Sequence, residues 1–381
     1  MGESERGTTE GSGAGRDARF MERALVLAGN GLGLAPPNPL VGAVVVAAGE
    51  IVGEGWHEGP GTAHAEVIAL REAGDRAHGA TLYTTLEPCS HQGRTPPCAP
   101  AVARAGIARV VAAVRDPNPV VDGAGLRILR GAGVAVDEGV LNEPAARLIE
   151  GFAKHVTTGL PFVTLKMAAS LDGRVAAKDG TSRWITGAEA RQDVHRLRAA
   201  SGAIVVGAGT VLADDPSLTV RLDGYGGRPP LRVAVDGAGR IPASRAMFDA
   251  TAPTLIASVR GVDASTRGGW ERAGAEVAEL DGGPGEGTVS LSLLMELLGK
   301  RDVQTVLLEG GPTLAWSAVE AGIVDRFVLY LAPTLIGGAE APGILGGGGI
   351  RTIADALPVE IVEVETLGRD LKVVADVHRD R

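Results

Sequence analysis

The first part of the chain alternates between apolar residues at helical spacing and short β-branched runs. In residues 17–29, Phe20, Ala24 and Leu27 fall on one face, which predicts an amphipathic helix ending at Asn30. Strands are predicted as a pair in LVGAVVVAAGEIVGEGW and singly in ATLYTTLEP and ARVVAAV. Helices are predicted in HAEVIALREAG and CAPAVARAG, and a further helix and strand in GLRILRGAGVAVDEG. This alternation over about 140 residues is typical of a three-layer α/β domain.

The second half continues the alternation of strands and helices. Strands are predicted in FVTLKMA, AIVVGA, RVAVD, TLIASV, EVAEL, TVLLEGG, RFVLYLA, EIVEVETLG and LKVVADV. Helices are predicted near residues 188–200, 290–300 and 313–321. Between the halves, residues 150–170 hold the end of a helix near His155, a Thr-Thr-Gly-Leu-Pro turn and a new strand. We therefore place a domain junction there.

These patterns divide the chain into four segments. The length of 381 residues already favours two domains over one. The opening stretch MGESERGTTEGSGAGRD is rich in Gly, Ser and Glu, which predicts a disordered tail. We expect this tail over residues 1–16, a first domain over 17–150, a linker over 151–160 and a second domain over 161–381.

Composition and charge narrow the classes of partner. The net charge is −9 and aromatic residues make up only 3%, which disfavours general nucleic-acid binding and base-stacking surfaces. No apolar run reaches the roughly 18 residues of a membrane span, and the N-terminus lacks the apolar core of a signal peptide. We therefore expect a cytoplasmic protein without a nucleic-acid or membrane partner. In that compartment a disulfide between the two cysteines of the chain is disfavoured.

The two cysteines lie close to each other and follow a histidine that begins a predicted helix. Cys89 follows a strand end and Cys98 opens a helix, while His64 and Glu66 stand at the start of another helix. Two thiolates and one imidazole can hold zinc with a fourth position open to water, whose pKa the metal lowers from about 16 to near 7. Glu66 can then carry protons to a leaving amine.

This order of residues matches the H-x-E and P-C elements of zinc-dependent base deaminases, although eight residues separate the cysteines in place of the usual two. Two other interpretations remain at this point. The zinc could be structural, which needs a fourth protein ligand, and His91 is the one nearby candidate. Alternatively, Cys89 and Cys98 are ordinary core residues without a metal.

The motifs LEPCSHQGRTPPC, PPNPLVGAVVV, AHAE and RDPNP stand in an order that closely resembles the bifunctional deaminase/reductase family of riboflavin biosynthesis. The resemblance runs from about residue 17 to the C-terminus. It implies a cytidine-deaminase-like three-layer α/β/α domain followed by a dihydrofolate-reductase-like α/β domain. It also implies hydrolytic deamination of a diaminopyrimidinone ribosylamine phosphate, followed by reduction of the ribosyl group to ribityl with NADPH.

In the first domain the resemblance assigns His64, Cys89 and Cys98 as ligands of one Zn²⁺ and Glu66 as the proton shuttle. It also places three loop residues near the pyrimidine ring: Asn38, His91 and Asn118. Ordinary turn chemistry explains the two asparagines equally well, because both adjoin proline.

In the second domain the resemblance assigns contacts to substrate and to NADPH. The substrate contacts are Ser182, Arg198, Leu218, Arg221 and Glu309. The cofactor contacts are Ala168, Trp184, Thr210, Asp214, Gly311, Pro312, Thr313, Leu314, Ala315, Trp316 and Ser317. Arginines can grip a phosphate bidentately, and a Gly-Gly-Pro turn before a helix presents N–H groups to an anion. A plain strand-to-helix connection without a ligand is the alternative for this turn.

Two further residues of the second domain are candidates for moving a proton. Lys166 and Asp214 are ionisable and lie in the matching segments, although Lys166 could instead reach solvent from the end of its strand. The run IVVGAGTVLADDP hints at a dinucleotide fingerprint. We reject that interpretation, because Leu212 occupies the position of the third glycine.

Two other functions remain open from sequence. The first is a zinc deaminase of a nucleoside or RNA base with a non-catalytic C-terminal binding domain, which the acidity and the scarcity of aromatic residues disfavour. The second is a reductase half that serves only as an assembly scaffold. The resemblance also implies a homo-oligomer, a dimer or larger.

Overall fold

The computed structural model describes residues 13–285 and 287–377, and the chain divides into two compact units after Thr158. Most of the predicted tail lies outside the described residues, and residues 13–16 already belong to the first helix. The segment expected to be a linker is largely helical, because helix α6 spans Glu150–Thr158. Each unit contains its own sheet and its own cores.

The first unit is a five-stranded sheet in the order β2-β1-β3-β4-β5. Strand β1 is antiparallel to β2 and β3, whereas β3, β4 and β5 are parallel. Its elements are α1 (Gly13–Gly29), β1 (Gly42–Ala47), β2 (Glu50–Trp56), α2 (Ala65–Ala73), a 3₁₀ turn at Gly74–Ala77, β3 (Thr81–Leu86), α3 (Cys98–Arg104), β4 (Arg109–Val114), α4 (Ala124–Gly131), β5 (Ala135–Glu138), α5 (Asn142–Leu148) and α6.

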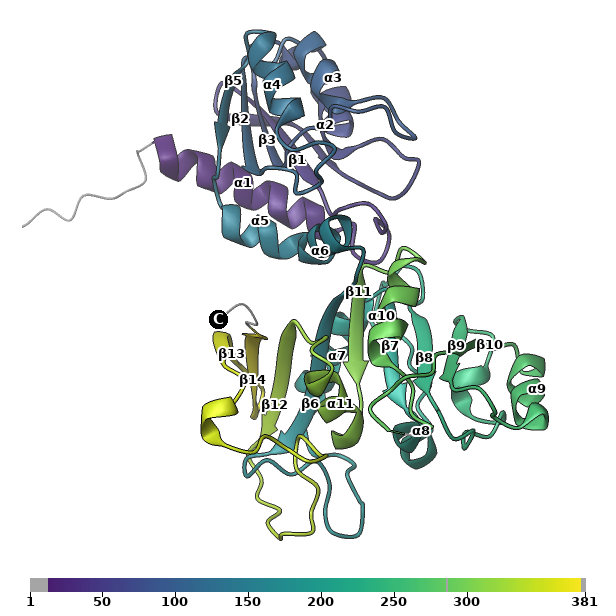
Figure 1. Ribbon diagram of the computed structural model, residues 1–381. Helices are drawn as coiled ribbons and strands as arrows, with labels where there is room; N and C mark the ends of the chain where they lie inside the picture. The colour runs from purple at the N-terminus through teal and green to yellow at the C-terminus, as the bar shows by residue number, and fades with distance from the viewer. Residues whose placement is uncertain (1–12, 286, 378–381) are drawn as a thin grey trace, which may run out of the picture. The chain divides into compact units, whose positions relative to one another are not determined.

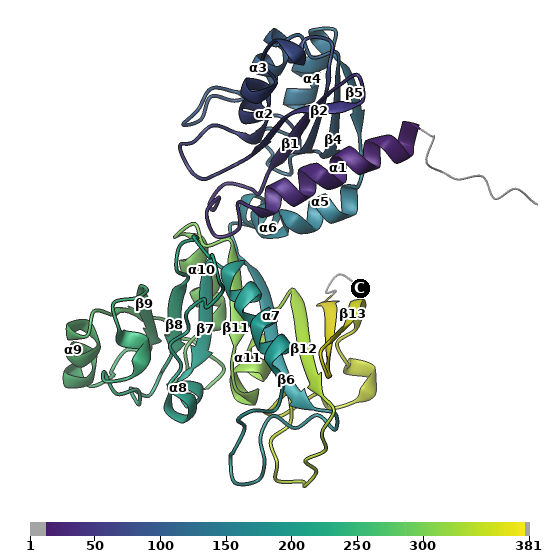
Figure 2. The ribbon, with the colours of Figure 1, turned by 180° about the vertical axis from the view of Figure 1, so that it is seen from behind.

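Helices cover both faces of this sheet, which confirms the predicted three-layer domain (Figures 1 and 2). Helices α2, α3 and α4 pack on one face, and α1 and α5 pack on the other. Helix α5 is not evident from sequence because Ala145 is its one buried residue, so no apolar period marks it.

Helix α2 approaches the sheet closely over β2. A Cβ added at Gly55 would lie 2.2 Å from the carbonyl oxygen of Ala65, so only glycine allows this contact. The contact holds the first turn of α2, with His64 before it and Glu66 within it, against the sheet. The glycines of β2 thus fix the place of two candidate site residues.

The second unit is a nine-stranded sheet in the order β10-β9-β8-β7-β11-β6-β12-β14-β13. All pairs from β10 to β12 are parallel, and β14 and β13 complete the edge in antiparallel fashion. Its elements are β6 (Phe162–Ser170), α7 (Ala188–Ala199), β7 (Ala203–Gly207), α8 (Ala208–Asp214), β8 (Leu231–Val235), a 3₁₀ turn at Ala246–Phe248, β9 (Thr254–Ser258), α9 (Ala264–Arg272), β10 (Glu276–Glu279), α10 (Leu291–Gly299), β11 (Thr305–Glu309), α11 (Pro312–Glu320), β12 (Arg326–Ala332), a 3₁₀ turn at Ile353–Asp355, β13 (Val359–Leu367) and β14 (Asp370–Val377).

Every strand predicted in the second half is present, and α10 and α11 cover the face opposite α7 (Figures 1 and 2). Helices α8 and α9 were not predicted. Helix α8 follows Gly207 directly but has only seven residues, and the turn lacks a third glycine, in keeping with the rejected dinucleotide fingerprint. Strand β11 enters between β7 and β6, so the strand order reverses there, which is where parallel sheets open a crevice.

No helix among the described residues is both long enough and apolar enough to cross a membrane.

Candidate metal centre and second-domain cleft

Three sequence-distant side chains converge in the first unit. His64 precedes α2, Cys89 follows β3, and Cys98 is the first residue of α3. The Nδ1 atom of His64 lies 3.1 Å from Sγ of Cys98 and 3.4 Å from Sγ of Cys89. Within the described part of the chain, these are the three residues whose ligand atoms cluster within 4.8 Å.

The cluster fits a zinc ion. Zinc bonds of about 2.1 Å to nitrogen and 2.3 Å to sulfur set a tetrahedral nitrogen–sulfur edge of roughly 3.6 Å, close to the distances found. The three donors leave one tetrahedral position. His91, the candidate for a fourth protein ligand, is exposed and lies outside the cluster. The donor set therefore matches a catalytic site better than a closed structural one.

Neighbouring groups orient the three ligands. The other ring nitrogen of His64, Nε2, lies 3.1 Å from Oγ1 of Thr95, which leaves Nδ1 directed at the sulfurs. The backbone N–H of Cys98 donates to Sγ of Cys89 at 3.3 Å. The hydrogen bond from the Cys98 thiol, together with His64, lowers the pKa of Cys89 well below its usual range. This favours the thiolate form that binds a metal. Sequence reasoning did not find Thr95.

Glu66 lies in the first turn of α2 and is only 3% exposed. Burial raises the pKa of its carboxyl group to about 7, and the negative charge of Cys89 adds to that effect. Glu66 interacts with Cys89 and Cys98 but is not part of the ligand cluster, and its role as proton shuttle stays a prediction. A bound dication would favour the carboxylate.

The three predicted pyrimidine contacts lie in three different loops: Asn38 before β1, His91 between β3 and α3, and Asn118 between β4 and α4. Nδ2 of Asn38 lies 2.8 Å from Nε2 of His57, and the His57 ring packs edge-on against His64 with centroids 5.3 Å apart. Burial lowers the pKa of His57, so its ring is neutral at pH 7. His57 was not found by sequence reasoning, although it directly follows strand β2.

Asn118 lies in the loop between β4 and α4. Its Oδ1 accepts the backbone N–H of Val120 at 3.0 Å, so part of its side chain is used in a local turn. Asp116 precedes it, is 8% exposed, and was also missed. Burial raises the pKa of Asp116 to about 6, and Glu87 and Cys89 add to the shift.

The second unit contains a cleft of about 1660 Å³ at the strand-order reversal. Most of the residues predicted for substrate and cofactor line it. They are Lys166, Ala168, Ser182, Trp184, Arg198, Thr210, Asp214, Leu218, Arg221, Glu309, Gly311, Pro312, Thr313, Leu314 and Ser317. Ala315 and Trp316 are not among the lining residues, and the Ala315 side chain is fully buried in the core against the sheet.

Lys166, Glu309 and Arg198 form a charged group on one side of the cleft. Glu309 of β11 is the direct neighbour of Lys166 on β6. Arg198 donates two hydrogen bonds of 2.7 and 2.9 Å to the carboxylate of Glu309 and a third, of 3.1 Å, to the carbonyl of Thr219. Arg198, the predicted phosphate contact, is thus already paired with a carboxylate 111 positions away in the sequence.

Burial acts on both ionisable neighbours in this group. It lowers the pKa of Lys166, and Glu309 only partly offsets that effect. Burial alone would raise the pKa of Glu309, but the charge and hydrogen bonds of Arg198 together with the charges of Lys166 and His195 outweigh it and leave the pKa below its ordinary value. Lys166 lies in the middle of β6 and lines the cleft. The alternative of a lysine that reaches solvent from the end of its strand is therefore wrong.

The Gly-Gly-Pro turn lies at the N-terminus of α11. Pro312 is the first residue of the helix and Gly311 precedes it. The N–H of Gly311 donates to Oγ1 of Thr210 at 3.2 Å, so Thr210 ties this turn to α8. Trp184 is 68% exposed beside the cleft, and the Arg191 guanidinium lies 4.8 Å from its ring centroid.

Two family models match separate parts of the chain. The cytidine and deoxycytidylate deaminase zinc-binding region matches residues 15–114, and the RibD C-terminal domain matches residues 161–373. With the cluster and the cleft, these matches define a two-domain enzyme that joins a zinc-dependent deaminase to a reductase.

Relatives of known name cover nearly the full length. Riboflavin biosynthesis protein RibD of Escherichia coli is 43% identical over 367 residues, covering 93% of this chain and 98% of the relative. The protein of that name from Aquifex aeolicus is 42% identical over 358 residues, covering 94% and 97%. The chain therefore belongs to the RibD family of bifunctional enzymes of riboflavin biosynthesis.

Solved structures agree with this assignment. RibD from Acinetobacter baumannii, form 2, has a TM-score of 0.84 at 38% identity, covering 96% of this chain and 100% of that chain. A diaminohydroxyphosphoribosylaminopyrimidine deaminase/5-amino-6-(5-phosphoribosylamino)uracil reductase from Thermotoga maritima has a TM-score of 0.83 at 35% identity, with coverage of 96% and 100%.

The comparisons confirm the main expectations from sequence. The resemblance, the fold class and the bifunctional deaminase/reductase assignment are all correct. The enzyme uses zinc in its first domain and NADPH in its second. The two interpretations with a non-catalytic second half are thereby set aside.

Proposed function

We propose that this enzyme deaminates a diaminopyrimidinone ribosylamine phosphate and then reduces the ribosyl group to ribityl with NADPH. The observation that supports this most directly is the pairing in one chain of the His64–Cys89–Cys98 cluster with a cleft that holds Lys166 and Glu309. The Thermotoga maritima relative is named for deamination and reduction of such phosphoribosylaminopyrimidines.

In the proposed deamination, His64, Cys89 and Cys98 hold the zinc, which when bound supplies Lewis acidity that activates water. Glu66, buried beside the cluster, takes a proton from the attacking water and delivers it to the departing amine. Asn38 and Asn118 orient the pyrimidine from two loops. His91 is exposed in the loop between the two cysteines and contacts the substrate from there.

In the proposed reduction, bound NADPH would supply a hydride, and the N–H groups at the start of α11 would hold one of its phosphates. Lys166 and Glu309 lie side by side, so they can hold and move a proton at the ribose ring oxygen as the ring opens. Arg198 and Arg221 bind the substrate phosphate, with Ser182 and Leu218 beside them. The cofactor side is formed by Ala168, Trp184, Thr210, Asp214, residues 311–314 and Ser317. The contacts of Ala315 and Trp316 stay predictions, because neither residue lines the cleft.

A coupled assay tests this function. The diaminopyrimidinone phosphate is incubated with purified enzyme, with and without NADPH, and ammonia release, NADPH oxidation and zinc content are measured together. We expect ammonia in both arms and NADPH oxidation that depends on prior deamination. Turnover of cytidine or tRNA without turnover of the pyrimidine phosphate would overturn the proposed substrate.

Replacing Arg198 with alanine should raise the reductase KM for the substrate by about tenfold or more, the effect of losing one charged hydrogen bond. It also leaves the Glu309 carboxylate buried without its partner, which should lower kcat. Steady-state kinetics on pre-deaminated substrate measure both effects. Arg301→Ala, which removes an arginine paired with Glu276 away from the cleft, is the matched control. An unchanged KM would remove Arg198 from the phosphate site.

We also propose that the enzyme is cytoplasmic and self-associates through the outer sheet edge. Strand β13 ends the sheet, and Val359, Ile361 and Val364 on it are 48%, 63% and 61% exposed. An edge strand with exposed apolar side chains can pair with a second copy, although Glu363 and Glu365 also lie exposed on β13. Analytical ultracentrifugation measures the mass in solution, and a monomer at micromolar concentration would contradict self-association.

A further inference from the structure

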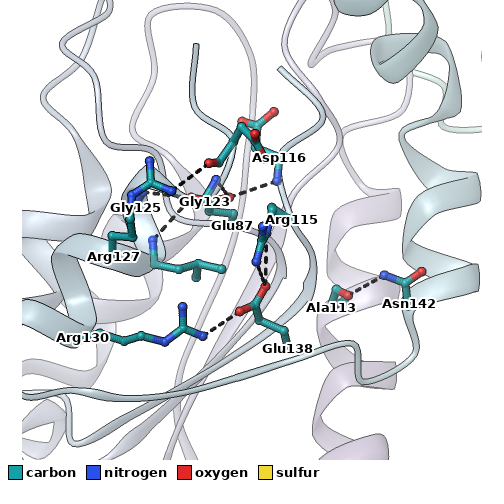
Figure 3. A network of polar contacts seen from close by, with 12 residues as sticks. Glu87, Ala113, Arg115, Asp116, Gly123, Gly125, Arg127, Arg130, Glu138 and Asn142 are labelled. Carbon is teal, nitrogen blue, oxygen red and sulfur yellow. Dashed lines mark hydrogen bonds and ion pairs between the residues drawn. The ribbon is translucent and has the colours of Figure 1, made fainter. Parts of the chain in front are cut away.

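Glu87 lies between the end of β3 and the ligand Cys89, and it is only 2% exposed. Its carboxylate has no cationic partner among the hydrogen bonds and ion pairs of the described residues. Instead it accepts four backbone N–H groups of the segment from the end of β4 to the first turn of α4 (Figure 3). Oε2 accepts from Asp116 at 3.1 Å and Gly123 at 2.9 Å, and Oε1 accepts from Gly125 at 2.8 Å and Leu126 at 3.3 Å.

These four bonds enclose the loop 115–123, which contains no strand or helix. Two side chains of the loop also accept local backbone bonds. Asp116 Oδ1 accepts the N–H of Asn118 at 2.9 Å, and Asn118 Oδ1 accepts that of Val120 at 3.0 Å. A buried carboxylate that accepts several N–H groups is held in one orientation by those hydrogen bonds. The positive end of the helix dipole of α4 favours the same orientation of the negative carboxylate. Glu87 therefore fixes both ends of this loop.

Helix α4 also packs closely against the backbone next to Glu87. A Cβ added at Gly125 would lie 1.8 Å from the carbonyl oxygen of Pro88 and 3.2 Å from Oε1 of Glu87. The first turn of α4 thus packs directly on the residue that precedes Cys89. Through Glu87 and Gly125, the stretch that leads into the ligand Cys89 is in direct contact with the helix that ends the loop 115–123.

We propose that Glu87 is a positioning residue of the deaminase that holds the loop 115–123 in its substrate-binding orientation beside the metal ligands. It does not touch substrate itself, since its carboxylate is buried under four N–H groups. The inference rests on the proposed function in one respect, namely that this loop meets the pyrimidine.

Glu87→Gln tests the proposal. The amide keeps one acceptor oxygen, but its NH₂ group would face two of the N–H donors, so about half of the contact is lost. We expect the deaminase KM to rise about tenfold or more. Zinc stoichiometry, kcat per bound zinc and reductase activity should stay unchanged.

Two further variants make the test specific. Gly125→Ala disturbs the same contact from the α4 side, and we expect the same rise in KM. Glu138→Gln is the matched control. Glu138 also bridges the loop and α4, through Arg115 and Arg130, but from the solvent side (Figure 3). Its KM should equal that of the wild type.

The outcomes separate positioning from simple stabilisation. If Glu87→Gln and Gly125→Ala lower the melting temperature but leave KM unchanged, Glu87 only stabilises the domain and the proposal is overturned. Loss of zinc with unchanged KM would overturn it as well. Asn118→Ala separates the two proposals. A raised KM in Asn118→Ala alone overturns the Glu87 inference and keeps the substrate loop. A raised KM in Glu87→Gln alone supports the inference and removes Asn118 from the proposed contacts.

Discussion

Glu66→Gln should lower the deaminase kcat by about 10²-fold or more, while zinc remains bound and the reductase stays fully active. The amide has nearly the shape of the carboxylate, so packing around this 3%-exposed side chain is kept. It cannot accept a proton from water and return it to the leaving amine. Since Glu66 is not part of the ligand cluster, the metal should stay in place.

The measurement is ammonia release at saturating substrate, with zinc measured in the same preparation. Glu72→Gln is the matched control, because Glu72 is exposed on the same helix α2. We expect wild-type kinetics from it. A Glu66→Gln enzyme that deaminates at the normal rate would exclude Glu66 as the proton carrier.

Cys98→Ser should abolish both zinc binding and deamination. Removing a partner that merely orients a ligand already costs about 10- to 100-fold in metal affinity, so losing a ligand itself should cost more. Serine is nearly isosteric with cysteine, and the backbone N–H at this position still donates to Cys89. The fold of the first domain should therefore survive, as circular dichroism would show.

The second domain of the same molecule is the control for Cys98→Ser. NADPH oxidation on pre-deaminated substrate should persist at the wild-type rate, because the cleft residues all belong to the second unit. Loss of both activities would point to a shared site or to misfolding. Full zinc retention would instead contradict the proposed ligand set.

The agreement between sequence and structure differs among residues for physical reasons. His64, Cys89 and Cys98 could be named in advance because zinc accepts few ligand types, and they stand at helix and strand ends that local patterns reveal. Thr95 and His57 could not, because threonine and histidine near a turn have many ordinary uses. Their importance lies only in distances of 3.1 and 5.3 Å from His64.

Arg198 illustrates a different kind of limit. The sequence indicates an arginine able to bind a phosphate, and it lines the cleft as expected. Its bidentate bond to Glu309 joins α7 to β11 over 111 positions of sequence, and no local period encodes such a contact. Likewise, helices α5, α8 and α9 escaped prediction because they bury few residues at helical spacing.

By itself the sequence determined the alternation of strands and helices, the division into two domains, the zinc-ligand residue types and the family. Each of these depends on local periodicity or on motifs within a few residues. The tertiary structure decided which distant groups meet: Lys166 beside Glu309 through the register of β6 and β11, and Glu87 under the N–H groups of residues 116–126. Such contacts depend on strand order, register and loop packing, and these arise from the whole core.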